Sequence, residues 1–126
     1  MSIRTPLARV RGLGAAKDGT HHWWLQRVTA VILIPLTLWF VISLLAISHA
    51  DYATFQQWLS NPIRAGLMAT LLVATFYHAS LGMQVIYEDY VRPEGAKVAA
   101  LLVTQFVLFV LGAISVIAVL KVALGG

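Results

Sequence analysis

The chain has 126 residues, of which 60% are hydrophobic and 11% are charged, against about 25% charged in an ordinary soluble domain. This composition excludes a soluble globular protein. The net charge of +4 would suit a nucleic-acid partner, but the nine Lys and Arg residues form no stripe interleaved with aromatic side chains, so no nucleic acid is expected. The absence of cysteine excludes a disulfide framework, a thiolate zinc site and a Cys-ligated iron–sulfur cluster.

Three stretches contain no Asp, Glu, Lys or Arg: residues 28–50, 65–87 and 98–120. Each is 23 residues long, which as an α-helix covers about 34 Å and slightly exceeds a hydrocarbon core of about 30 Å. Their continuous apolar character differs from the alternating pattern of barrel strands. The sequence therefore predicts an all-α membrane protein with three transmembrane helices. Because the remaining segments are short, residues 1–126 are expected to form a single membrane-anchor domain.

The basic residues outside these runs predict the orientation. Seven of them lie in the N-terminal segment and in the 88–97 loop: Arg4, Arg9, Arg11, Lys17, Arg27, Arg92 and Lys97. Only Arg64 and Lys121 lie on the opposite side. The positive-inside rule then places the N-terminus in the cytoplasm. The basic first 20 residues resemble a transit peptide, but no apolar region with a small-residue cleavage site follows, which favours a bacterial inner membrane over a mitochondrial one.

Aromatic residues and prolines mark the predicted elements in chain order. Trp23 and Trp24 precede the first run, at the level where amphipathic rings prefer the headgroups. Pro35 predicts a kink in the first helix, with Thr29 or a neighbouring helix available to satisfy the backbone groups that it frees.

The segment between the first two runs predicts a short helix over 51–59, lying in the outer interface. Tyr52, Phe55 and Leu59 would share one side of it. Asn61 and Pro62 then read as the N-cap and first position of the second long helix. That helix is expected to continue to about Val91, because Pro93 and Gly95 are the first strong breakers.

His78 is the one ionisable side chain, tyrosines apart, deep inside any of the three runs. An intramembrane ionisable residue is costly and usually faces a cofactor, a cavity or a partner, so His78 is a candidate haem ligand or proton relay. The alternative is a neutral histidine hydrogen-bonded to a neighbouring helix. Gly82 follows one turn later and would let a flat macrocycle approach the backbone, unless it serves close helix packing instead.

A sixth ligand for the haem iron is not apparent in this chain. His21 and His22 precede the first run and His49 lies at its other end, so each is displaced by roughly 15 Å from the level of His78 along the membrane normal. A second axial histidine would therefore come from another polypeptide, which predicts a hetero-oligomeric helix bundle.

Asp89 and Tyr90 follow at the end of the second helix, and Asp89 returns to within about 20° of the face of His78. A tyrosine hydroxyl can donate a hydrogen bond to a quinone carbonyl, and a neighbouring carboxylate can orient it or help to deliver protons. The alternative is an interfacial tyrosine beside a solvated carboxylate, and Tyr77 and Tyr87 share this ambiguity.

Arg27 precedes the first run and is a candidate partner for a haem propionate, although a positive-inside anchor would have the same position. The sequence contains no pattern typical of a hydrolytic triad, a phosphate-binding loop or a carboxylate metal site.

Two stretches resemble a known family. His78-Ala79-Ser80-Leu81-Gly82-Met83, followed by Glu88-Asp89-Tyr90, resembles the second-helix signature of the small cytochrome b-type membrane-anchor subunit of succinate dehydrogenase. Arg27-Val28-Thr29-Ala30 is similar to that family's opening of the first helix, and the three-span plan also matches. The adjacent basic residue and histidine that mark the larger anchor subunit are absent.

The resemblance implies that His78 is one axial ligand of haem b, with the other from the partner anchor subunit. It implies that Asp89 and Tyr90 border a ubiquinone site against the iron–sulfur subunit. The chain would tether the flavoprotein and iron–sulfur subunits of complex II, where succinate is oxidised, and would itself hold no catalytic residue. The rival functions are an anchor of fumarate reductase or of another quinone-linked oxidoreductase, and a non-redox membrane scaffold or transporter component.

Overall fold

The computed structural model describes residue 6 and residues 17–126. Along the second range the chain forms four α-helices: α2 (Lys17–Ile47), α3 (Tyr52–Leu59), α4 (Pro62–Tyr90) and α5 (Glu94–Ala123). Neither described range contains a strand, and the predicted all-α fold is confirmed. Three helices are long and apolar enough to cross a membrane, over Thr20–Ile47, Pro62–Tyr90 and Glu94–Ala123. The basic residues Arg4, Arg9 and Arg11 lie outside the described residues.

The helices extend beyond the charge-free runs at most of their ends. α2 begins at Lys17, so Trp23 and Trp24 lie inside a helix that starts well before the apolar run. At its other end the first run continues three residues past Ile47, into the turn that contains His49. Charges mark the boundary of the hydrocarbon, whereas the helical backbone needs only its own hydrogen bonds and continues into the headgroup region.

Capping residues fix where α3 and α4 begin. The side chain of Asp51 accepts a hydrogen bond from the backbone N–H of Thr54 at 2.9 Å. The side chain of Asn61 accepts from the N–H groups of Ile63 and Arg64, and Pro62 occupies the first turn of α4. Both arrangements satisfy N–H groups that have no partner inside the helix. The predicted N-cap at Asn61 is confirmed, and α4 ends at Tyr90, close to the predicted Val91.

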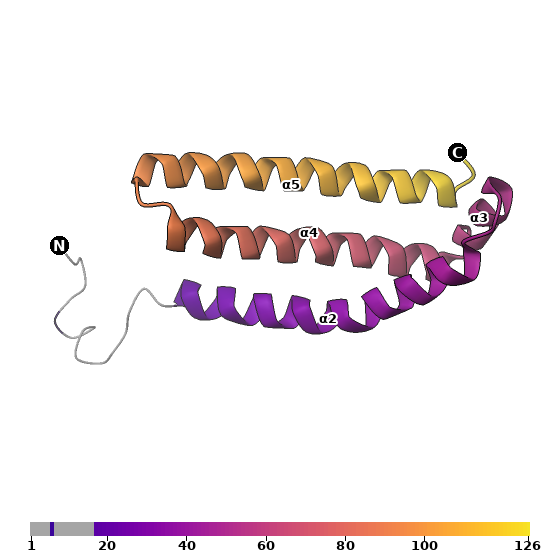
Figure 1. Cartoon of the computed structure of the whole chain (residues 1–126), viewed down its shortest axis with the longest axis horizontal. Coiled ribbons are helices and arrows are strands. Elements are labelled where there is room, and N and C mark those ends of the chain that lie inside the picture. The colour runs from indigo at the N-terminus through magenta and orange to yellow at the C-terminus, as the bar shows by residue number, and fades with distance from the viewer. Residues whose placement is uncertain (1–5, 7–16) are drawn as a thin grey trace.

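α2 stays helical through Pro35 and bends in its C-terminal half (Figure 1). A proline removes the backbone donor to the carbonyl four residues earlier, here that of Val31. The prediction that Thr29 is available for this freed group was wrong. Its hydroxyl is already occupied, because it donates to the carbonyls of Leu25 at 2.7 Å and Gln26 at 3.0 Å.

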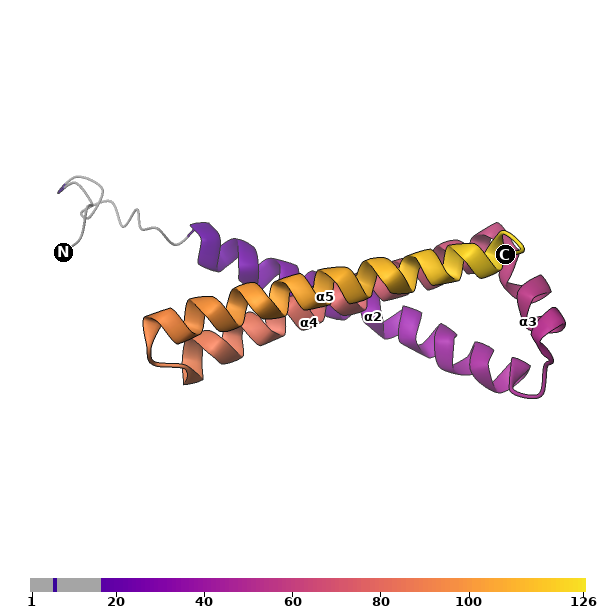
Figure 2. The ribbon, with the colours of Figure 1, turned by 90° about the horizontal axis from the view of Figure 1, so that it is seen from above.

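α4 is the central helix of the three long ones, and it packs against both α2 and α5. α4 and α5 run side by side along their length, whereas α2 crosses them obliquely (Figure 2). Gly112 of α5 lies against the ring of Phe76, where an added Cβ would come within 3.3 Å of the ring carbon Cγ. The missing side chain lets the two helix backbones approach closely.

α3 closes the end of the bundle opposite the start of α2 (Figure 1). Leu59 is 1% exposed and Phe55 is half-buried, but Tyr52 is 61% exposed, so only two of the three residues predicted on one side are covered. Trp58 stacks on Trp39 of α2 with ring centroids 6.1 Å apart. This stacking joins α3 to α2.

Few side chains are buried in the part of the chain that the structure describes. Six apolar residues and Thr29 make up the buried set, and α5 contributes none of them. Large apolar side chains are instead exposed along all three long helices. In a membrane these surfaces contact lipid or other transmembrane helices at little cost, so the chain needs no core of its own.

Candidate functional site

His78 lies at the contact between α4 and α2. It is half-buried, and its Nδ1 atom lies 2.9 Å from the hydroxyl oxygen of Thr29. Thr29 is 7% exposed and is the one buried polar residue among those described. The hydrogen bond offsets the cost of placing Nδ1, a polar atom, inside the membrane. The structure shows no hydrogen bond from a described residue to the other nitrogen, Nε2.

The sequence indicated Thr29 as a partner for the backbone near Pro35 and as part of the stretch Arg27–Ala30, but not as a contact of His78. A signal was present, since a threonine inside an apolar run must find a partner for its hydroxyl. The partner could not be read from the sequence, because the crossing of α2 over α4 decides which residues meet.

The other histidines lie far from His78 along the bundle axis. Thr29 marks the level of His78 on α2. His22 precedes it by seven residues, or about 10 Å of helix, which is less than the roughly 15 Å expected from the sequence. His22 Nε2 is shielded and has no hydrogen-bond partner among the described residues. His21 is one residue further away, and His49 lies in the turn beyond the other end of α2. No group of three or more His, Cys, Asp or Glu within the described ranges is arranged to hold a metal ion.

Gly82 lies one turn beyond His78 on α4 and is open on its outer side. A Cβ atom built at Gly82 would meet no atom within 4 Å, in contrast to Gly112, which lies against Phe76. Four residues correspond to about 40° around the helix, so Gly82 shares a face with His78. Helix packing inside this chain therefore does not account for this glycine, and the space beside it is free for a group from outside the chain.

The end of α4 presents two polar residues, Asp89 and Tyr90, whose side chains are exposed. Tyr90 is 80% exposed, Asp89 is exposed, and neither side chain has a hydrogen-bond partner among the described residues. The adjacent Glu88 differs, because one of its carboxylate oxygens accepts from Gln84 at 3.1 Å. Asp89 lies about 20° from the face of His78. At this end the start of α2 diverges from α4 (Figure 2), and Asp89 is exposed.

Tyr87 and Tyr77, which the sequence left ambiguous, have different surroundings. The Tyr87 hydroxyl lies 2.7 Å from the hydroxyl of Thr104 on α5 and joins the two helices. Tyr77 is 42% exposed and lines a groove between α4 and α5. Neither tyrosine forms a hydrogen bond with Tyr90, whose hydroxyl has no partner among the described residues.

Arg27 is exposed, and its guanidinium lies 4.9 Å from the centre of the Trp23 ring. It precedes Thr29 by two residues, which is about 200° around α2. Arg27 is therefore near the level of His78 but on a different side of α2 from the Thr29 contact.

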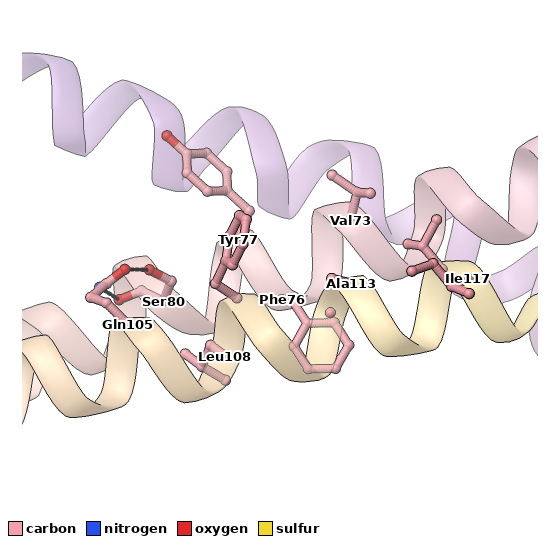
Figure 3. A pocket seen from close by; sticks show the side chains of 11 residues that line it. Val73, Phe76, Tyr77, Ser80, Gln105, Leu108, Ala113 and Ile117 are labelled. Atoms are coloured by element: carbon pink, nitrogen blue, oxygen red, sulfur yellow. Dashed lines mark hydrogen bonds between the residues drawn. The ribbon is translucent and has the colours of Figure 1, made fainter.

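A groove of about 620 Å³ runs between α4 and α5 (Figure 3). Its lining is mostly apolar, and its polar side chains are Tyr77, Ser80 and Gln105. The serine hydroxyl donates to Gln105 Oε1 at 2.6 Å. None of His78, Asp89 and Tyr90 lines it. The groove could not be predicted from the sequence, because it forms only when two helices are placed side by side.

Known proteins provide an independent comparison. The family described as succinate dehydrogenase/fumarate reductase transmembrane subunit matches residues 1–112. A succinate dehydrogenase hydrophobic membrane anchor subunit of Rickettsia bellii is 39% identical over 89 residues, which is 71% of each chain. The corresponding subunit of Rickettsia conorii is 31% identical over 104 residues and 82% of each chain. That of Paracoccus denitrificans is 27% identical over 125 residues, covering 99% of this chain and 96% of the relative.

Proposed function

Because the chain belongs to the succinate dehydrogenase/fumarate reductase transmembrane subunit family, we propose that it is the hydrophobic membrane anchor subunit of a succinate dehydrogenase, respiratory complex II. It has no catalytic role of its own in succinate oxidation and belongs to the enzyme as one of its subunits. Its task is to hold the catalytic subunits at the membrane and to help pass their electrons to ubiquinone. We take residues 1–126 as one membrane-anchor domain.

The arrangement of His78 carries the proposal that this subunit helps to bind haem b. The ring is held from one side by Thr29 through Nδ1, and its Nε2 has no hydrogen-bond partner among the described residues. A neutral imidazole nitrogen of this kind is a common metal ligand. Gly82 leaves open space one turn away on the same face. These residues fit a haem, which when bound would supply a one-electron site within the membrane.

The second axial ligand is proposed to come from the partner anchor subunit, because the other histidines described here are too far along α2 to share one iron with His78. The exposed apolar faces of the three long helices suit packing against that subunit and against lipid. The proposed assembly contains this chain, a second cytochrome b anchor, an iron–sulfur subunit and a flavoprotein subunit.

The end of α4 is proposed to border the ubiquinone site. Reduction of ubiquinone to ubiquinol takes two electrons and two protons, and the quinone oxygens become basic as the electrons arrive. The Tyr90 hydroxyl can donate a hydrogen bond to a quinone carbonyl, and Asp89 can pass protons from water to this region. Both side chains are exposed and unpaired among the described residues, as a site shared with another subunit requires.

Arg27 is proposed as the cation for a haem propionate, with the boundary-anchor role as the alternative. Arg27 lies on a different side of α2 from Thr29, so its position in this chain alone does not support the role. Substitution of Arg27 is the test. We place the N-terminus and the end of α4 at the cytoplasmic face of a bacterial inner membrane, following the distribution of basic residues. A mitochondrial inner membrane is the less favoured alternative.

An anchor of fumarate reductase is the second candidate, since the matching family includes both enzymes. The direction of catalysis distinguishes the two. The relatives described above are named as succinate dehydrogenase subunits, which favours the first candidate. Membership of this family disfavours a non-redox scaffold or transporter component.

Purification of the tagged chain from its native membrane tests the proposal. We expect a flavoprotein, an iron–sulfur protein and a second small membrane subunit to co-purify with succinate:quinone reductase activity and a low-spin b-type haem spectrum. His78→Ala should abolish or shift that spectrum. A colourless homo-oligomer would contradict the proposed function, and an unchanged spectrum in His78→Ala would contradict ligation by His78.

A further inference from the structure

The contact between α2 and α4 contains four polar groups connected by hydrogen bonds: two backbone carbonyls, one hydroxyl and one imidazole nitrogen. The Thr29 hydroxyl lies 2.7 Å from the carbonyl oxygen of Leu25 and 3.0 Å from that of Gln26. On its other side it lies 2.9 Å from Nδ1 of His78. All of these atoms are at the contact between the two helices, and Thr29 is 7% exposed.

The positions of the protons in these hydrogen bonds follow from the donors and acceptors present. A hydroxyl has one proton, and a carbonyl oxygen has none to give. The Thr29 proton must therefore point to the carbonyls of Leu25 and Gln26, because otherwise two oxygens would face each other at 2.7 Å with no proton between them. The Thr29 oxygen is then the acceptor in the hydrogen bond with His78. The donor must be Nδ1, which therefore carries a proton.

A neutral imidazole that is protonated at Nδ1 has its lone pair on Nε2. This is the nitrogen without a hydrogen-bond partner in the described part of the chain, and it is the atom that a metal ion would take. Without Thr29 the ring could adopt the opposite tautomer, with a proton at the position needed for the metal, and it could rotate about its side-chain bonds. The hydrogen-bond partner of a metal-ligating histidine fixes its tautomer and its ring orientation.

We infer that Thr29 is a positioning residue for His78: by accepting a hydrogen bond from Nδ1–H, its hydroxyl oxygen holds the imidazole in the tautomer and orientation that present Nε2 to haem iron. This inference rests on the proposed haem ligation by His78 and adds a residue on a different helix. The packing of α2 against α4 would then help to form the haem site, although α2 provides no iron ligand in this proposal.

The variant Thr29→Val tests this, because it removes the hydroxyl and keeps the shape of the side chain. The matched control is Thr75→Val on α4. The Thr75 hydroxyl donates to the carbonyl of Leu71 at 2.7 Å, the same bond to a preceding turn, but has no histidine contact. Thr29→Ser is the rescue variant, since serine keeps a hydroxyl that can bond in both directions. If the Thr29→Val complex does not accumulate, Thr29→Ala removes the same hydroxyl with a smaller side chain.

The readout is the haem of the affinity-purified whole complex, measured as the rate of haem loss to an excess of apomyoglobin and as the paramagnetic resonance spectrum of the ferric low-spin haem. That spectrum responds to the orientation of the axial imidazole planes. We expect Thr29→Val to lose haem about 10- to 100-fold faster than wild type and to shift the resonance. Thr75→Val and Thr29→Ser should stay close to wild type.

His78→Ala separates the two levels of the proposal. If His78→Ala keeps the low-spin haem spectrum, the proposed ligation fails and the role of Thr29 fails with it. If His78→Ala loses the spectrum while Thr29→Val matches Thr75→Val in both readouts, ligation by His78 stands and the positioning role of Thr29 is overturned.

Discussion

Tyr87 of α4 and Thr104 of α5 share a hydrogen bond of 2.7 Å, whereas Tyr90, less than one turn further along α4, is 80% exposed and has no partner among the described residues. The two tyrosines look equivalent in the sequence, but one hydroxyl joins two helices of this chain and the other is free for a ligand or a second subunit. This difference gives each tyrosine a separate expected phenotype.

Tyr90→Phe should lower ubiquinone reduction by the complex about 10- to 100-fold, because it removes a hydrogen bond to an oxygen that gains charge during reduction. The measurement is succinate-dependent ubiquinone reduction over a range of quinone concentrations. Tyr87→Phe is the matched control and should keep turnover and quinone affinity. An undiminished rate and affinity in Tyr90→Phe would remove Tyr90 from the mechanism.

Asp89→Asn should slow ubiquinone reduction about 10-fold or more, because the amide cannot carry protons to the quinone. Succinate oxidation with an artificial dye that accepts electrons from the catalytic subunits should be unchanged. Glu88→Gln provides the control, since the Glu88 carboxylate accepts a hydrogen bond from Gln84 and does not lie on the His78 face. Equal losses in the two variants would argue against a specific role for Asp89.

Gly82→Leu should reduce the haem content of the purified complex to less than half. The chain itself offers no atom within 4 Å of a Cβ at this position, so a clash would come from a group outside the chain. Gly66→Leu is the control, because Gly66 is also on α4 and equally open within the chain. Full haem occupancy in Gly82→Leu would show that the haem does not approach α4 at this glycine.

The pair Ser80 and Gln105 should stabilise the packing of α4 on α5. Its two contacts are the serine hydroxyl to Gln105 Oε1 at 2.6 Å and Gln105 Nε2 to the Ser80 carbonyl at 3.4 Å. Hydrogen bonds between transmembrane helices contribute about 0.6 kcal/mol on average and at most about 1.7 kcal/mol. A double-mutant cycle of Ser80→Ala and Gln105→Leu, measured by unfolding of the complex in detergent, should give a coupling energy in this range. Additive effects would mean that the pair does not stabilise the packing.

The cap of α3 should weaken in acid. Hydrogen bonds from the side chain and the backbone N–H of Thr54 hold the pKa of Asp51 below its ordinary value of 3.8. A group whose pKa is lowered by folding stabilises the folded state above its ordinary pKa, and this contribution is lost as the pH falls through the lowered value. Hydrogen-exchange protection of the Thr54 amide should therefore begin to fall at about pH 5 and be lost as the pH drops through the lowered pKa, below 3.8.

The reference for this measurement is the Ile63 amide, which bonds to the side chain of Asn61 and so has a cap that does not titrate. Protection at Thr54 should fall relative to protection at Ile63, and Asp51→Asn should remove the difference in pH dependence. Parallel loss of protection at both amides in the wild-type complex would mean that Asp51 is not its cause.

The features of this protein that depend on local chemistry could be predicted from its residues alone. Uncharged runs of membrane length predict three spanning helices, and Asn61 and Pro62 begin α4 because they satisfy or remove local donors. His78 could be identified as a candidate site residue because an ionisable side chain inside the hydrocarbon is costly and usually has a function. The helix ends were less predictable. The ends of the uncharged runs mark the edge of the hydrocarbon core, and the backbone can remain helical beyond it.

Which polar side chains meet depends on how the helices pack, and this could not be predicted from the sequence. Thr29 and His78 are 49 residues apart, and the crossing of α2 over α4 brings them to 2.9 Å. The register of α4 against α5 likewise occupies Tyr87 and leaves Tyr90 free. Helical periodicity assigns a residue to a face of its own helix, but the rotation, tilt and depth of neighbouring helices come from packing between side chains distant in the sequence.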